Sequence, residues 1–183
     1  AIIVPIAAKK EGVLEAVAAL KEKLVAADIR AEADLTDNSP GWKFNEWEMK
    51  GVPLRIELGP RDIEAGKMVL VRRDTHEKTE APLENAAETV AKLLAEIQTN
   101  LLETARRRKE ERVVPAENVG ELLKGVEGGN FVKAGWCGCR ECEDKIKEQT
   151  AATARVLVED EHAETCVCCG KPAKHVVLFA RAY

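Results

Sequence analysis

Residues 41–62 read GWKFNEWEMKGVPLRIELGPRD, and this stretch carries the clearest structural signals in the chain. Ser39-Pro40 just before it favours the start of a short helix, because serine caps helices and proline is tolerated at the first helical position. That helix is predicted to end at Gly51. Residues 53–58 alternate apolar and charged side chains, as in a strand with one buried face. Residues 59–62 are predicted to form a turn.

The rest of the first half continues this alternation of strands and helices. Apolar residues at steps of three and four predict a helix over 13–25. A long helix, opened by Ala81-Pro82, is predicted to run to about Ala105. Strands are predicted at residues 2–6, 29–35 and 68–73, and a hairpin over 74–79 leads to a short further strand. This order of elements indicates an α/β sheet domain over roughly residues 1–105.

The composition changes after residue 115, and shorter elements follow. A short helix is predicted near residues 119–126 and a second helix over 143–149. Strands are predicted at 131–134, 154–158 and 176–180. The last two strands flank the second of two groups of cysteines, which indicates a small domain organised around them.

Charge and hydropathy limit the classes of protein. The chain has 183 residues and a net charge of −4, which excludes a uniformly basic nucleic-acid coat but not a local basic site. No run of about 18 apolar residues is present, and no secretory signal is recognisable, so we expect a cytoplasmic protein without membrane contact. The chain opens on Ala1 immediately before a predicted core strand, which we interpret as the mark of a fragment.

The six cysteines, all after residue 136, have the spacing of metal ligands. Cys166 and Cys169 form a C-x2-C turn followed by Gly170, and Cys137 and Cys142 form a C-x4-C pair upstream. Four thiolates in two pairs suit one tetrahedral zinc ion in a closed, structural site, with no position left for a catalytic water. We therefore predict a zinc site at these four cysteines.

Spacing alone leaves other ligand sets open. Cys139 and Cys168 lie within the same two groups, and His162 and His175 could replace a thiolate. Six free or disulfide-bonded cysteines are the competing interpretation. Without a secretory signal, clustered cysteines are more often metal ligands than disulfides.

Aromatic and basic side chains are concentrated in residues 41–67. Such a mixture suits unstacked RNA bases, which stack on aromatic rings while cations meet the phosphates. The competing interpretation is a core helix with a solvated charged face. The residues concerned are Trp42, Lys43, Phe44, Trp47, Lys50, Arg55, Arg61 and Lys67.

The stretch 41–62 resembles the anticodon-binding domain of class II aminoacyl-tRNA synthetases, and prolyl-tRNA synthetases in particular. Trp136-Cys137, Cys142-Glu143, Cys166, the run 169–172 and the closing FARAY resemble the C-terminal zinc domain of the archaeal/eukaryotic-type prolyl enzymes. The resemblance implies a mixed-sheet anticodon-binding domain over 1–112 and a small α+β zinc-binding domain over 113–183. It also implies zinc at the same four cysteines that the spacing favours.

The resemblance further implies roles for individual residues. Glu48, Arg55 and Arg61 stand where the family contacts anticodon bases, and Tyr183 stands where the family's terminal carboxylate points toward the catalytic domain. The resemblance also places Lys43, Phe44, Glu57 and Asp62 on this anticodon-binding surface. ATP and Mg²⁺ would belong to a catalytic domain absent from these residues, so no catalytic residue is expected here. The implied partners are proline tRNA, that catalytic domain and, for the parent enzyme, a second subunit.

Proline anticodons end in two guanines, so the surface implied by the resemblance would have to recognise guanine. Glu48 offers acceptors for guanine N1–H and N2–H₂, whereas Arg55 and Arg61 offer donors for O6 and N7. We expect Lys43 and Lys50 to lie nearer the phosphates. The alternatives are a freestanding, non-catalytic RNA-binding module and a zinc-stabilised interaction module without an RNA role.

Overall fold

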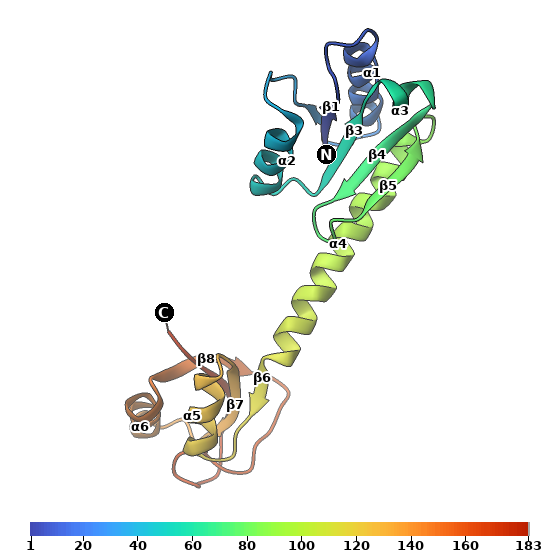
Figure 1. The fold of residues 1–183 in the computed structure, drawn as a ribbon. Coiled ribbons are helices and arrows are strands. Elements are labelled where there is room, and N and C mark those ends of the chain that lie inside the picture. The colour runs from blue at the N-terminus through green and yellow to red at the C-terminus, as the bar shows by residue number, and fades with distance from the viewer. Residues whose placement is uncertain (183) are drawn as a thin grey trace. The chain divides into compact units, whose positions relative to one another are not determined.

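The computed structural model of the protein describes residues 1–182 and divides into two compact units. The first unit is Ala1–Glu103, and the second begins at Thr104. Tyr183, for which a contact with a catalytic domain is expected, lies outside the described residues. Figure 1 shows both units and labels most of their elements.

The first unit is built on a mixed five-stranded sheet in the order β2-β1-β3-β4-β5. β1 runs parallel to β2 and β3, whereas β4 is antiparallel to both β3 and β5. The elements of this unit are β1 (Ile2–Pro5), α1 (Val13–Ala26), β2 (Glu32–Ala33), α2 (Pro40–Met49), β3 (Leu54–Leu58), α3 (Pro60–Glu64), β4 (Lys67–Arg72), β5 (Lys78–Pro82) and the first part of α4 (Ala86–Glu111). The predicted mixed α/β class is confirmed.

The two faces of this sheet have different surroundings. One face packs against apolar residues of α1 and α4, such as Leu24 and Val90, and forms the core of the unit. On the other face α2 packs against β1. Arg55 lies opposite Val71, which lies opposite Lys78, so these three side chains share that second face. The register thus brings charged residues of β3 and β5 onto the face that α2 partly covers.

Several element boundaries differ from the sequence predictions. The strand predicted over 29–35 is reduced to Glu32–Ala33, since only two residues pair with β1. The predicted turn at 59–62 is the start of α3, in which the Asp62 carboxylate accepts a hydrogen bond from the Gly59 backbone at 2.8 Å. The long helix begins at Ala86, because Ala81 and Pro82 pair with β4 as part of β5.

The second unit contains a four-stranded sheet in the order β6-β7-β9-β8. Its core gathers Leu122, Ile146 and Phe179, each fully buried. β6, which pairs in parallel with β7, was not predicted from the sequence because it is only three residues long. The elements are β6 (Val113–Pro115), α5 (Val119–Glu127), β7 (Phe131–Trp136), α6 (Arg140–Thr150), β8 (Ala152–Val158) and β9 (His175–Arg181).

Asp74 anchors the β4–β5 turn to α4. Its carboxylate accepts two hydrogen bonds from Arg72, at 3.0 and 2.8 Å, and one from Asn100 of α4 at 2.8 Å. The hydrogen bonds from Arg72 lower the pKa of Asp74 to about 2, against the opposing effect of burial, and Asn100 lowers it further. The ionised carboxylate therefore stabilises the fold above its ordinary pKa of about 4, and this stability is lost as the pH falls through about 2.

We expect Asp74→Asn to lower the free energy of unfolding at pH 7 by on the order of 2 kcal/mol. The difference from wild type should shrink below pH 4 and vanish near pH 2. Urea unfolding of both proteins across this pH range measures it, with the exposed Asp37→Asn as the control. A difference that stayed constant with pH would show that the charge of Asp74 is not what anchors the turn.

Candidate nucleic-acid interface and metal centre

Arg55 is the centre of a charged cluster on the second face of the first sheet. Its Nη1 donates to Glu48 Oε1 at 2.7 Å, and its Nε donates to Glu57 Oε1 at 3.2 Å. The guanidinium carbon lies 3.9 Å from the centroid of the Phe44 ring. Lys78 of β5 completes the cluster, because its Nζ donates to Glu57 Oε2 at 2.8 Å. Charges of alternating sign are therefore held in a fixed row.

Two elements position this cluster. α2 presents Phe44 and Glu48, four residues apart and so on one side of the helix. β3 presents Arg55 and Glu57, two residues apart and so on one face of the sheet. The predicted proximity of Glu48 and Arg55 is confirmed by their 2.7 Å ion pair. Arg55 has only 12% of its side chain exposed, so its charge is held mainly by these two carboxylates.

A small recess adjoins the Arg55 cluster. Phe44, Glu48, Arg55 and Arg73 are among the residues that line it, and its free volume is about 10 Å³. That volume holds at most one water molecule. Because Arg55 and Glu48 bind each other here, a planar base can reach their hydrogen-bonding groups only if it inserts beside or between them.

Lys43 is buried and does not lie where the sequence reasoning expected it. Its side chain is 3% exposed, and its Nζ donates to the Asp34 carbonyl at 2.9 Å and lies 3.6 Å from Asp34 Oδ1. The Asp34 carboxylate also accepts from Trp47 Nε1 at 2.7 Å and from Thr36 Oγ1 at 2.6 Å. These interactions join α2 to the segment after β2. Lys43 is thus part of an internal ion pair and is not placed to meet phosphates.

Burial of the Asp34 carboxylate raises its pKa, but the hydrogen bonds from Thr36 and Trp47 and the charge of Lys43 outweigh this effect. The net result is a pKa below the ordinary value. The Asp34 carboxylate is therefore held in its ionised form beside Lys43. No pattern in the sequence predicted this role for Asp34. A carboxylate nine residues before a lysine carries no sequence signal that the two will meet.

The other predicted interface residues lie in different surroundings. Lys50 is exposed, pairs with Glu46 at 2.9 Å and lies 4.4 Å from the centroid of the Trp47 ring. Arg61 is exposed in α3, beyond the carboxyl end of β3, whereas Arg55 lies near the other end of that strand. Asp62 is engaged in capping α3. Arg61 and Asp62 therefore do not belong to the Arg55 cluster, contrary to the expectation of one pocket.

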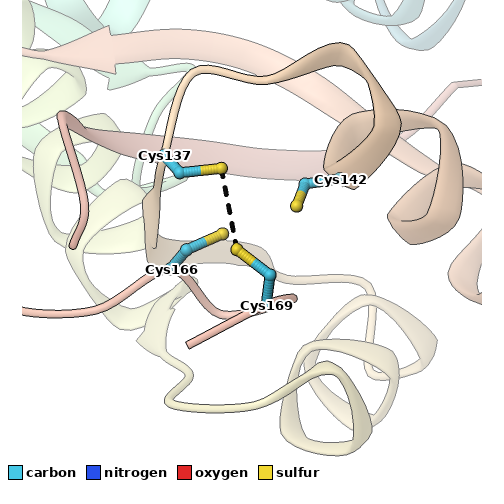
Figure 2. Close-up of side chains that lie close together, drawn as sticks. All are labelled: Cys137, Cys142, Cys166 and Cys169. Carbon is cyan, nitrogen blue, oxygen red and sulfur yellow. Dashed lines mark hydrogen bonds between the residues drawn. The ribbon is translucent and has the colours of Figure 1, made fainter. Parts of the chain in front are cut away.

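The four cysteines favoured by spacing converge in the second unit, as Figure 2 shows. The sulfur atoms of Cys137, Cys142, Cys166 and Cys169 all lie within 4.8 Å of one another. A tetrahedron with Zn–S bonds of about 2.3 Å has edges of about 3.8 Å. The Cys137 and Cys169 sulfurs are 3.8 Å apart, which fits such an edge. The arrangement can therefore hold a metal ion.

Backbone hydrogen bonds prepare this cluster for a cation. Burial raises the pKa of the Cys166 thiol, but backbone N–H groups of Cys169, Cys168 and Cys137 outweigh it and bring the pKa down to about 7. Burial also raises the pKa of Cys142 above its ordinary value, so a cation is needed to hold that thiolate. Gly170, with φ of +66°, provides a left-handed turn directly after Cys169.

Cys139 and Cys168 lie beside the cluster but outside the set of four. The Cys139 sulfur is 3.2 Å from that of Cys137, shorter than a tetrahedral edge, and Cys139 is the residue that precedes α6. Its carbonyl accepts a hydrogen bond from Trp136 Nε1 at 3.2 Å. The geometry therefore favours the set that the spacing favours.

None of the helices among residues 1–182 is both long and apolar enough to span a membrane.

Two known protein families match this chain. The family "Anticodon binding domain" matches residues 1–93, and "Prolyl-tRNA synthetase, C-terminal" matches residues 119–183. The chain belongs to the anticodon-binding domain family.

The similarity to prolyl-tRNA synthetases extends over the whole chain. Proline–tRNA ligases from Oceanobacillus iheyensis and Ruminiclostridium cellulolyticum are each 49% identical to it, over 185 and 187 residues, and the match covers 100% of this chain and 38% of each relative. The crystal structure of prolyl-tRNA synthetase from Cryptosporidium parvum complexed with L-proline and AMP superposes with a TM-score of 0.93 at 34% identity. That match covers 100% of this chain and 40% of the other. The chain thus spans about two fifths of the length of these relatives, and it is similar to the C-terminal part of a prolyl-tRNA synthetase.

Proposed function

We propose that the Arg55 cluster binds the anticodon of proline tRNA and that the chain serves as the tRNA-recognition part of a proline–tRNA ligase. The observation that carries this proposal is the arginine–glutamate pair held against an aromatic ring: Arg55 lies between Glu48 and Phe44. Such a set offers donors, acceptors and a stacking surface within a few ångströms of one another. Single-stranded RNA bases are recognised by this combination.

The chemistry of guanine matches the pair. Arg55 can direct two N–H groups at O6 and N7, and the Glu48 carboxylate can accept from N1–H and N2–H₂. In the structure Arg55 and Glu48 form an ion pair with each other. Binding of a base would therefore replace this ion pair by hydrogen bonds to the base. Adenine presents an amino donor where guanine has O6, so the Arg55 N–H directed at that position would face a donor and lose its acceptor, while the N–H directed at N7 would keep its partner. This difference supports selection for the guanines of a proline anticodon.

The direct test is binding of RNA hairpins that carry the proline anticodon or the same anticodon with a guanine replaced by adenine. Wild type should prefer the guanine hairpin, and Arg55→Ala and Glu48→Gln should each lose discrimination worth roughly 1–3 kcal/mol. Salt must be fixed, because phosphate contacts depend on it.

Lys50→Ala is the matched control. It removes a nearby exposed charge, so it should weaken both hairpins to a similar extent and leave the preference unchanged. Thermal unfolding shows whether each variant remains folded. Retention of the full guanine preference by both Arg55→Ala and Glu48→Gln would overturn the proposal.

We further propose that Cys137, Cys142, Cys166 and Cys169 hold one structural zinc ion. The donor set supports zinc, because four thiolates at tetrahedral spacing are typical of closed structural zinc sites. The ion would compensate the charge of the thiolates and join Cys137 and the first turn of α6 to the turn before β9. Cys139 and Cys168 remain outside the coordination sphere in this proposal.

The proposal for the whole protein is ligation of proline to its tRNA, with ATP and Mg²⁺ bound by a catalytic domain outside these residues. It rests on relatives that are proline–tRNA ligases along the entire chain. The same relatives favour this assignment over a freestanding RNA-binding module. We also propose that the enzyme is of the archaeal/eukaryotic type, on the basis of the four-cysteine domain and the similarity to the Cryptosporidium parvum structure. A cytoplasmic homodimer remains a proposal that follows from the family resemblance. We propose that Arg61 and Asp62 contact the tRNA outside the Arg55 cluster. For Tyr183 the proposal remains the contact with the catalytic domain that the resemblance implies.

A further inference from the structure

Arg73 follows β4 and lies on the same face of the sheet as Arg55. Its backbone N–H donates to the Pro53 carbonyl at 3.0 Å, which continues the ladder between β3 and β4 by one residue. Since side chains alternate along a strand, Arg73 shares the face of Val71, which lies opposite Arg55. Its neighbour Arg72 turns to the opposite face, where it binds Asp74. Two consecutive arginines thus have separate roles.

The guanidinium of Arg73 has an unsatisfied donor. Its Nε is buried, and no acceptor among the described residues lies within hydrogen-bonding distance of it. Arg73 also lines the recess that Phe44, Glu48 and Arg55 line. A buried donor without an acceptor is costly, so a ligand that supplies an acceptor gains more than it would at an exposed arginine.

We infer that Arg73 is a further anticodon-recognition residue, whose Nε–H donates to an acceptor on the edge of the base bound by Arg55 and Glu48. This inference rests on the proposed anticodon function and adds a residue to its site. The recess is too small for a base in the unbound state, so binding must widen it. A base that enters the recess would meet the Arg73 Nε–H, which lines it together with Arg55. Guanine O6 has two lone pairs, so it can accept from Arg73 as well as from Arg55.

The test compares Arg73→Ala and Arg73→Lys in the same hairpin-binding assay. Lysine keeps the charge and much of the aliphatic stem but has no N–H at the position of Nε. Both variants should therefore reduce the preference for guanine over adenine by about tenfold or more. Lys92→Ala, which removes an exposed charge from α4, is the control and should leave the preference intact.

The outcomes separate this inference from the proposed function. If Arg55→Ala loses the preference and Arg73→Lys keeps it, Arg73 does not read the base and only the inference fails. If Arg73→Ala weakens both hairpins equally, Arg73 acts through charge alone, which also overturns it. If Arg55→Ala itself keeps the preference, the anticodon assignment of the whole cluster fails. Thermal unfolding of Arg73→Lys shows that any loss of discrimination occurs in a folded protein.

Discussion

Removal of the metal is expected to unfold the second unit while the first unit stays folded. Four thiolates converge in a unit whose core is small, and the two segments that carry them are otherwise joined mainly through the sheet. Structural zinc in comparable small domains contributes about 10–16 kcal/mol at pH 7. This is comparable to or larger than the total stability of about 5–15 kcal/mol that is typical of a folded domain. The loss should therefore be complete rather than partial.

Calorimetry of the zinc-loaded and chelator-treated chain measures this effect. We expect the unfolding transition of the second unit to disappear on chelation and that of the first unit to persist. Elemental analysis should give one zinc per chain. Lowering the pH should weaken zinc binding, because protons compete for the thiolates.

The matched variants are Cys142→Ser and Cys168→Ser. Cys142 is a buried member of the set of four, whereas Cys168 is partly buried and outside it. Cys142→Ser should abolish stoichiometric zinc and the second transition, and Cys168→Ser should retain both. Equal damage from the two variants would show that the ligand set is wrong. Unchanged unfolding of metal-free protein would show that the cluster is not a structural metal site.

The second large effect is expected for Lys43→Ala, which should destabilise the first unit by about 3–5 kcal/mol. Removal of the ammonium leaves the Asp34 carboxylate buried with its hydrogen bonds from Thr36 and Trp47 but without a counter-charge. Because the same interactions join α2 to the segment after β2, the Arg55 cluster should lose its order as well. Urea unfolding monitored by tryptophan fluorescence measures the change.

Lys50→Ala is the matched control for this prediction, since Lys50 follows the same helix but pairs with Glu46 at the surface. It should change the stability by less than about 1 kcal/mol. The double variant Lys43→Met/Asp34→Asn should recover part of the loss, because it removes both charges together. A Lys43→Ala protein of wild-type stability with uniformly weaker RNA binding would instead support a phosphate contact at Lys43.

The cysteine cluster shows how far sequence reasoning reaches when spacing constrains geometry. The C-x2-C and C-x4-C spacings favoured these four cysteines without excluding Cys139 or Cys168, and the sulfur atoms of the four do converge. The proximity of Glu48 and Arg55 could also be predicted from the sequence, because only the end of a helix, a glycine and the start of a strand lie between them. Both predictions depended on local geometry alone.

Contacts between residues on different strands were not predicted from the sequence. Lys78 joins the Arg55 cluster because of the register in which β5 pairs with β4. The sequence predicted this strand without its bounds, so its register could not be predicted. Arg61 was expected in the same pocket from the family resemblance and from its place in a predicted turn just beyond the strand that carries Arg55. The intervening strand places the two near its opposite ends, and α3 begins where a turn was expected.

Local periodicity and caps by themselves predicted the type of most elements and the α/β class, because these depend on residues close in the chain, and cysteine spacing favoured the four cysteines that converge. Tertiary structure alone decided which charges are buried. Lys43 and Lys50 are seven residues apart, about two helical turns, and so belong to the same side of α2 by periodicity. One is buried because Asp34, whose backbone N–H donates to the Ile3 carbonyl of β1, meets the ammonium of Lys43 as well as the indole of Trp47. Lys50, at the end of the helix, has its partner Glu46 at the surface and stays exposed.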